Sequence, residues 1–199
     1  STMTMSTAGV LSGTPVNADV AAHTVVVTAT DGTASVTDTF DVTVTNTNDA
    51  PTVASAISDV SSAEDAAYSL DVSGTCTDVD VGDSLAYTMS GAPSTLSIAS
   101  GTISGTPLNA DVGTHTITVT CTDDSSAAAT ASDSYVLTVT NTNDAPTVTS
   151  ALSDASTAED GSYSLDASSM CTDVDVGDSL AYTMSGAPST LSIASGTIS

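Results

Sequence analysis

The chain contains 199 residues, of which 24 are Asp or Glu, two are His and none is Lys or Arg, so its formal charge is −24. Without a cationic side chain it cannot neutralise phosphates, which excludes nucleic-acid binding and docking to an anionic membrane surface. Hydrophobic residues make up 40% of the chain and alternate with polar ones as in strands, which argues against disorder. Because no side chain can pair with the carboxylates, metal cations are the natural compensation for their charge.

Self-comparison shows a tandem repeat whose period is about the length of a small domain. Three pairs of matching segments carry it: 76–104 with 171–199, 43–53 with 138–148, and 11–31 with 103–123. The first pair is identical letter for letter. We expect the motif NTNDAP to mark the boundary. It divides the chain into the C-terminal part of one repeat (1–49), a complete repeat (50–144) and the N-terminal part of the next (145–199).

Neither partial repeat can close a core alone. Completion of one chain's first segment by the last segment of another, as in strand donation, fits poorly, because residues 1–12 and 188–199 occupy the same part of the repeat. The favoured interpretation is a window from a longer tandem array. The expected partners are therefore further repeats of the same long chain, with self-association into a filament or a surface partner as alternatives.

Four alternating runs in the complete repeat predict strands. The residues that alternate with polar neighbours, in chain order, are Tyr68, Leu70 and Val72; Leu85, Tyr87 and Met89; His115, Ile117, Val119 and Cys121; and Tyr135, Leu137 and Val139. Ser and Thr fill most intervening positions, Gly and Pro punctuate the turns, and no segment shows a sustained helical period. About seven strands per repeat predict an all-β fold of tandem Greek-key sandwiches, immunoglobulin-like or cadherin-like, in a linear rod.

Acidic and amide residues gather in a few short motifs of the complete repeat. These are Glu64–Asp65, the DVDVGD run with Asp78, Asp80 and Asp83, Asn109 with Asp111, Asp123–Asp124, and Asn141 with Asn143 and Asp144. Calcium takes six to eight oxygen ligands from carboxylates, amides and backbone carbonyls. Loops that are distant in sequence meet at the same end of a sandwich. The alternative interpretation of each motif is a solvated turn, and for the DVDVGD run taken alone it is at least as good.

The order of the motifs resembles that of cadherin-like repeats. They are SAED at 62–65, TDVDVGDSLAYTMS at 77–90, TPLNADVGTHTITVTCTD at 106–123 and NTNDAP at 141–146. The whole chain is similar to the dystroglycan-type cadherin-like (immunoglobulin-like) modules that occur in tandem in large surface proteins. In that family, calcium lies between consecutive domains and stiffens the joint. Four motifs in this order, in a chain without cations, favour calcium because unpaired converging carboxylates repel one another.

Carried over motif by motif, the resemblance implies two calcium sites. The first would use Asn17, Asp19, Asn46, Asn48 and Asp49, with Asp78, Asp80 and Asp123 from the following repeat. The second would use Glu64, Asn109, Asp111, Asn141, Asn143 and Asp144, with Asp173 and Asp175 from the following repeat. Ala50 and Ala145 replace a ligating Asn of the family, and its Asp-Arg-Glu motif is reduced to Asn-Ala-Asp. We therefore expect fewer or weaker ions than at the strongest cadherin junctions.

Cys76 and Cys121 occur in matching Cys-Thr-Asp contexts, each two residues before a proposed ligand. We expect a disulfide between them, which would pin two ligand loops together and which implies an oxidising compartment; two free buried thiols are the alternative. Cys171 repeats Cys76, and its partner would lie beyond the end of this sequence. His23 and His115 occupy one inward strand position, where a His bonded to the backbone is favoured over a zinc ligand.

The residue inventory argues against an enzyme, because it offers no Lys nucleophile, no Arg clamp and no recognised catalytic motif. We expect instead a non-enzymatic, extracellular or cell-surface segment whose calcium-stiffened repeats form the shaft of a filament, appendage or adhesin stalk. One alternative is a calcium-dependent adhesion module that binds through the domain faces. A second is a non-catalytic carbohydrate-binding module of a secreted enzyme, which the absence of Trp disfavours.

Overall fold

The computed structural model describes residues 3–125 and 128–199, and these residues confirm the predicted all-β fold. The strands are β1 (Thr4–Met5), β2 (Leu11–Ser12), β3 (Ala21–Thr30), β4 (Ser35–Val44), β5 (Thr52–Val53), β6 (Val60–Ala63), β7 (Tyr68–Asp71), β8 (Cys76–Thr77), β9 (Ala86–Ser90), β10 (Leu96–Ala99), β11 (Thr102–Gly105), β12 (Gly113–Thr122), β13 (Thr130–Thr140), β14 (Thr147–Val148), β15 (Leu165–Asp166), β16 (Cys171–Thr172), β17 (Ile193–Ala194) and β18 (Thr197–Ile198). Two short 3-10 turns, η1 (Asn17–Asp19) and η2 (Asn109–Asp111), precede β3 and β12. Within the described ranges, no helix has the length and apolar character that a membrane crossing requires.

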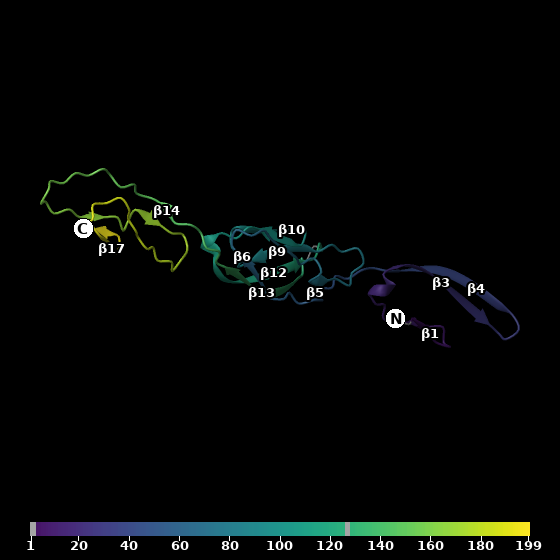
Figure 1. Cartoon of the computed structure of the whole chain (residues 1–199). Coiled ribbons are helices and arrows are strands. Elements are labelled where there is room, and N and C mark those ends of the chain that lie inside the picture. Colours follow the sequence, from purple (N-terminus) through teal and green to yellow (C-terminus); the bar gives the residue numbers. More distant parts are fainter. Residues whose placement is uncertain (1–2, 126–127) are drawn as a thin grey trace. The chain divides into compact units, whose positions relative to one another are not determined.

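The complete repeat is built from two main sheets (Figure 1). One has the strand order β6-β13-β12-β9 and the other the order β10-β11-β7, while β5 and β8 form a separate two-residue pair. The four alternating runs predicted from the sequence correspond to β7, β9, β12 and β13. Along β12 the burial pattern alternates, as expected of a strand with one face turned to a core.

The core of this repeat consists of apolar side chains from both sheets, from β8 and from the segment between β7 and β8. They are Tyr68, Val72, Cys76, Leu96, Ile103, Ile117, Val119, Cys121, Tyr135, Leu137 and Val139, each less than a tenth exposed. The outward positions are mainly Ser and Thr, whose hydroxyl groups hydrate well without charge. A small core of this kind leaves little stability in reserve, so covalent and ionic constraints at its ends matter.

Contact density groups the chain into two compact units. Unit 1 comprises Ser1–Val60, Ser69–Gly105 and His115–Leu137, and unit 2 comprises Ser61–Tyr68, Thr106–Thr114 and Thr138–Ser199. Each of the acidic clusters described below lies within one of these units.

The two partial repeats form fewer strand pairs than the complete one. Residues 3–49 form the small hairpin β1–β2 and the long hairpin β3–β4, whose ten residue pairs run from Ala21↔Val44 to Thr30↔Ser35 (Figure 1). Residues 145–199 form the pair β14–β16 and the sheet β15-β18-β17. Apolar residues such as Val26 and Phe40 stay 59% and 44% exposed on the long hairpin.

Candidate metal centres

The first acidic cluster forms on the DVDVGD turn that follows β8. Carboxylate oxygens of Asp78, Asp80 and Asp83 all lie within 4.8 Å of one another. The turn closes because the Asp80 N–H donates to Asp78 Oδ1 at 2.9 Å, and because Gly82 takes a positive φ of 102° that other residues rarely adopt. Asp80 is buried, at 5% exposure. Three carboxylates therefore converge on one point, the middle one buried and the other two half-buried.

The linker that precedes the complete repeat contacts this first cluster directly. The backbone N–H of Asp49 donates to Asp80 Oδ2 at 2.7 Å. The amide of Asn48 donates to Asp123 Oδ2 at 2.9 Å, and the amide of Asn17 donates to Asp49 Oδ2 at 2.8 Å. Backbone and side chains of the NTND motif thus join the η1 turn to two loops of the next repeat.

The pKa values of two carboxyl groups in the first cluster are shifted in opposite directions. Burial, followed by the neighbouring charges of Asp124 and Asp80, raises the pKa of Asp83 above its ordinary value. The hydrogen bond from Asn48 lowers the pKa of Asp123, with help from the hydroxyl group of Ser125. Asp123 is therefore held ionised by donors, whereas Asp83 meets repulsion that a cation would relieve.

The second acidic cluster gathers at the end of β6 and at the NTND motif that follows β13. Carboxylate oxygens of Glu64, Asp65 and Asp144 lie within 4.8 Å of one another. Glu64 is only 2% exposed, and its Oε1 accepts the N–H of Thr142 at 2.8 Å. Burial, followed by the charges of Asp175 and Asp65, raises the pKa of Asp144.

The DVDVGD turn of the next copy completes the second cluster. Asp175 is buried, and its Oδ2 accepts the backbone N–H of Asp144 at 2.8 Å, as Asp80 does from Asp49 in the first cluster. Its Oδ1 accepts the amide of Asn109 at 2.9 Å. Oxygens of Asp173, Asp175 and Asp178 also lie within 4.8 Å of one another. The same contact between linker and turn therefore occurs twice in the chain.

Asn141 lies at the centre of the second cluster. With its amide nitrogen turned inward, it donates to Glu64 Oε1 at 3.0 Å and to Asp175 Oδ1 at 3.1 Å. Asn141 therefore links the buried carboxylate of Glu64 to the buried carboxylate of Asp175 in the next copy.

Buried carboxylate oxygens without donors provide the test of whether a cation fits. Among the described residues, Glu64 Oε2, Asp78 Oδ2 and Asp80 Oδ1 are buried and accept no hydrogen bond. A buried, unpaired carboxylate oxygen is costly, and the sequence contains no Lys or Arg to pair with it. Hard oxygen donors in this number and spacing suit calcium. The residues present therefore fit the ion that the family resemblance implies.

The predicted site residues divide into two groups by position. Those that contact another member of their cluster are Asn17, Asn48, Asp49, Asp78, Asp80, Asp123, Glu64, Asn109, Asn141, Asp144, Asp173 and Asp175. The others have local contacts or are exposed: Asp19 and Asp111 each accept a backbone N–H of their own 3-10 turn, Asn143 donates to the carbonyl of Asp144, and Asn46 is exposed. Three further carboxylates, Asp65, Asp83 and Asp178, join the clusters although the motif comparison did not assign them.

A comparison with protein families assigns the chain. The family model described as "Putative Ig domain" matches residues 1–45 and 50–140, well over half of the sequence. The chain belongs to this immunoglobulin-like family. Domains of this family and of the cadherin type are typically non-catalytic and usually extracellular. No curated protein matches the chain.

Among solved structures, this Ig-like chain is similar to cadherin domains. Extracellular cadherin domains 1–5 of protocadherin gamma B2 match with a TM-score of 0.53 and 22% identity, over 76% of this chain and 33% of that chain. Cadherin domains 1–4 of protocadherin gamma B7 match over 99% of this chain and 54% of that chain, with 19% identity and a TM-score of 0.49. The endo-fucoidan hydrolase MfFcnA4 from glycoside hydrolase family 107 matches with a TM-score of 0.39 and 27% identity, over 66% of this chain and 20% of that chain. The Ig-like chain thus spans less than two thirds of each, and the first match shows the cadherin-like fold.

The Ig-like repeat contains the expected disulfide. Cys76 on β8 is bonded to Cys121 on β12, and Cys171 is a free, half-buried thiol. Asp78 and Asp123 follow the bonded cysteines by two residues each. The bridge therefore restrains both strands from which the first cluster draws its buried carboxylates.

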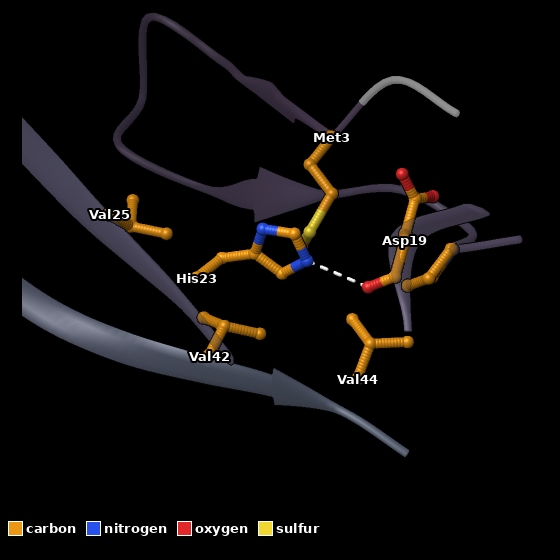
Figure 2. Close-up of a pocket in the computed structure, with 7 residues that line it drawn as sticks. Met3, Asp19, His23, Val25, Val42 and Val44 are labelled. Carbon is orange, nitrogen blue, oxygen red and sulfur yellow. Dashed lines mark hydrogen bonds between the residues drawn. The ribbon is translucent and has the colours of Figure 1, made fainter. Parts of the chain in front are cut away.

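The two histidines of the Ig-like repeats lie beside the 3-10 turns rather than in the acidic clusters. The Nε2 of His23 lies 2.7 Å from the carbonyl oxygen of Asp19, at hydrogen-bond distance (Figure 2). His115 is half-buried at the matching position of β12. A backbone-bonded His at this position agrees with the interpretation favoured from the sequence.

Proposed function

We propose that this chain is a non-enzymatic structural segment of an extracellular protein, in which calcium at the two acidic clusters stiffens successive Ig-like repeats. A structural or adhesive role is what the Ig-like and cadherin-like fold supports in general. The calcium-dependent part of the proposal rests on one repeated observation. In both clusters the linker donates a backbone hydrogen bond to the buried Asp of a DVDVGD turn, and buried carboxylate oxygens of the clusters accept no hydrogen bond.

The chain's own residues perform most of the joining. Asp49 and Asp144 tie each linker to a turn through their backbone N–H groups, and the amides of Asn48 and Asn109 add a second tie in each cluster. Residues that would hold calcium are Asp78, Asp80, Asp83 and Asp123 in the first cluster, and Glu64, Asp65, Asn141, Asp144, Asp173 and Asp175 in the second. Bound calcium would supply the positive charge that the sequence lacks.

A structural role follows from the repetition of the clusters. A ligand-recognition site would usually single out one repeat, whereas identical joint chemistry in successive repeats gives a uniform assembly. We propose that further repeats of a long chain are the partners, and that the product is the shaft of a surface filament, appendage or adhesin stalk. The likeness to the endo-fucoidan hydrolase gives no support for a carbohydrate-binding role, because its TM-score is too low.

Calorimetric titration with calcium tests the proposal. The chain, stripped of metal with a chelator, should bind calcium at two separable classes of site, and magnesium should compete weakly because its rigid octahedral preference does not suit crowded carboxylates. A chain that shows no calcium-dependent heat and no calcium-dependent rise in melting temperature would refute the proposal.

A further inference from the structure

Two separate sheets supply the residues of the first acidic cluster. The short strands β5 and β8 pair only with each other among the described residues, with Val53 opposite Cys76. The linker that contains Asn48 and Asp49 leads into β5, and the DVDVGD turn leaves β8. Asp123, by contrast, follows β12 of the four-stranded sheet. The cluster therefore depends on how the β5–β8 pair is held against β12.

Polar contacts join these two parts of the first cluster, and like charges oppose them. The amide of Asn48 donates to Asp123 Oδ2 at 2.9 Å, and the hydroxyl group of Ser84 donates to Asp124 Oδ2 at 2.7 Å. Asp83 of the turn and Asp124 repel each other, and the sequence contains no Lys or Arg to separate them. Without a cation, the charges push the turn away from the end of β12.

The disulfide is a covalent tie between the same two parts. Cys76 begins β8 and Cys121 lies near the end of β12, and the two are 5% and 0% exposed. The chain reaches Asp78 and Asp123 two residues after the bonded cysteines. A bond at this place opposes the repulsion at the cluster. Ligands that are held together before the ion arrives need less ordering on binding, which increases affinity.

We propose that the bond between Cys76 and Cys121 sets the calcium affinity of the first cluster, and that calcium bound there protects the bond from reduction. The inference rests on the proposed function, since it takes calcium as the ion of this cluster. The two effects are reciprocal: if the bond raises the affinity for calcium by some factor, calcium raises the equilibrium constant for forming the bond by the same factor. The joint at the first cluster is then strongest in a medium that is oxidising and contains calcium.

Reduction of the bond requires a thiol reductant from solution, such as a dithiol. One sulfur of the dithiol attacks the protein disulfide and forms a mixed disulfide, and its second sulfur then displaces the protein sulfur. Two electrons and two protons pass from the dithiol to Cys76 and Cys121, which become thiols, and the dithiol becomes a disulfide. Because both cysteines are buried, the attack needs local opening between β8 and β12. Calcium that holds the turn against Asp123 makes this opening rarer.

Calcium titration followed by NMR tests the effect of the bond on affinity. The parent chain carries Cys171→Ala, which removes the free thiol and prevents disulfide exchange. The amide signals of Gly82 and Gly177 report on the two DVDVGD turns separately. When Cys76→Ala and Cys121→Ala are added, the calcium affinity reported by Gly82 should fall by about tenfold or more, whereas that reported by Gly177 should change little.

A matched variant separates positioning from general loss of stability. Ile117 is fully buried on the same strand as Cys121, and Ile117→Ala removes core volume while the bond remains. This variant should be less stable than the parent, but the calcium affinity reported by Gly82 should stay the same.

The reciprocal measurement uses the parent chain with its bond intact, so it decides the question even if the bond-free variant does not fold. The chain is equilibrated with reduced and oxidised dithiothreitol, and the free thiols are counted by alkylation and mass spectrometry. Saturating calcium should raise the ratio of reduced to oxidised dithiothreitol at which half of the bond is reduced, by the factor found for affinity. Asp80→Asn should remove most of this protection.

The outcomes distinguish this inference from the proposed function. Equal affinity at Gly82 with and without the bond, an equal loss of affinity in Ile117→Ala, or a midpoint of reduction that calcium does not move would each overturn the inference and leave calcium binding intact. An oxidised parent chain that binds no calcium at Gly82 or Gly177 would refute the proposed function and this inference together.

Discussion

At the scale of single residues, the chain is governed by carboxylates that have no cationic partner. Asp80 illustrates the consequence, because Oδ2 accepts the N–H of Asp49 while Oδ1 is buried without a donor. One oxygen is thus used to fix the linker, and the other is left to a cation. The same residue is both a structural acceptor and a candidate ligand, which explains why the turn tolerates its burial.

Asp80→Asn should therefore weaken calcium binding at the first cluster by at least about tenfold, since it removes a buried charge and replaces an acceptor oxygen or a ligand by an amide group. Calorimetric titration measures the change. Asp38→Asn is the matched control, because it makes the same chemical change on an exposed position of β4 outside the clusters. Equal affinity of the two variants for calcium would contradict the assignment of Asp80.

Asp71 and its copy Asp166 predict a pH dependence outside the clusters. The hydroxyl group and backbone N–H of Ser73 lower the pKa of Asp71, and Ser168 does the same for Asp166. A carboxyl group whose pKa is lower in the folded state stabilises the fold above its unfolded pKa, and this stabilisation is lost as the pH falls through the folded value. Carboxyl NMR titration should show both depressed values, and Ser73→Ala should return Asp71 toward the ordinary one. Unchanged titration in the variant would exclude this cause.

At the scale of elements, the disulfide adds stability that the small core of the sandwich does not supply by itself. Cys76 and Cys121 are 45 residues apart, so their bond restrains a large loop of the unfolded chain. Replacing both by Ala should cost roughly 2–5 kcal/mol of unfolding free energy, measured by denaturant titration. Cys171→Ala, which removes a free thiol, should change stability far less. A double variant as stable as the original chain would show that the bridge is dispensable.

The long strand pairs have matching sequences but different burial, which gives a second test at this scale. Val139 is 2% exposed in the complete repeat, and its counterpart Val44 is half-buried in the first hairpin. Val139→Ala should cost about 1.5–3 kcal/mol because a buried side chain is lost from the core, and Val44→Ala should cost clearly less. Thermal unfolding compares the two variants. Equal destabilisation would mean that the first hairpin is covered as well as the core.

The strands of the complete repeat could be predicted from the sequence, because alternation of apolar and polar residues is typical of a sheet with one buried face. Ala86–Ser90 and residues 181–185 show the limit, since their letters are identical and only the first forms a strand. β9 pairs with β12, whose copy does not occur within residues 145–199. Strand formation there depends on a distant partner, which local sequence does not contain.

The sequence predicts which segments contain the acidic clusters, but it does not predict which carboxylates converge in each cluster. Asp83 and Asp178 join their clusters because a glycine with positive φ folds the DVDVGD turn back on itself, and Asp65 joins because its own φ is +57°. Asp19 and Asp111, which the motif comparison also assigned, each accept a backbone N–H at the start of their own 3-10 turn. The backbone conformation decides which carboxylates converge, and the spacing of Asp and Glu in the sequence does not reveal that conformation.

At the scale of the whole molecule, the same kind of hydrogen bond joins a linker to a DVDVGD turn in both acidic clusters. Asp49 with Asp80, and Asp144 with Asp175, make the same contact in the two clusters. A chain of net charge −24 needs counter-charge wherever such contacts concentrate carboxylates. Calcium at every linker would meet this need and would restrain each hinge in the same way.

Small-angle X-ray scattering of the chain, with and without a chelator, tests this account most directly. The account predicts a longer maximum dimension and a narrower range of conformations when calcium is present, with a reversible loss of both after chelation. An identical maximum dimension and flexibility in both conditions would contradict calcium-stiffened joints.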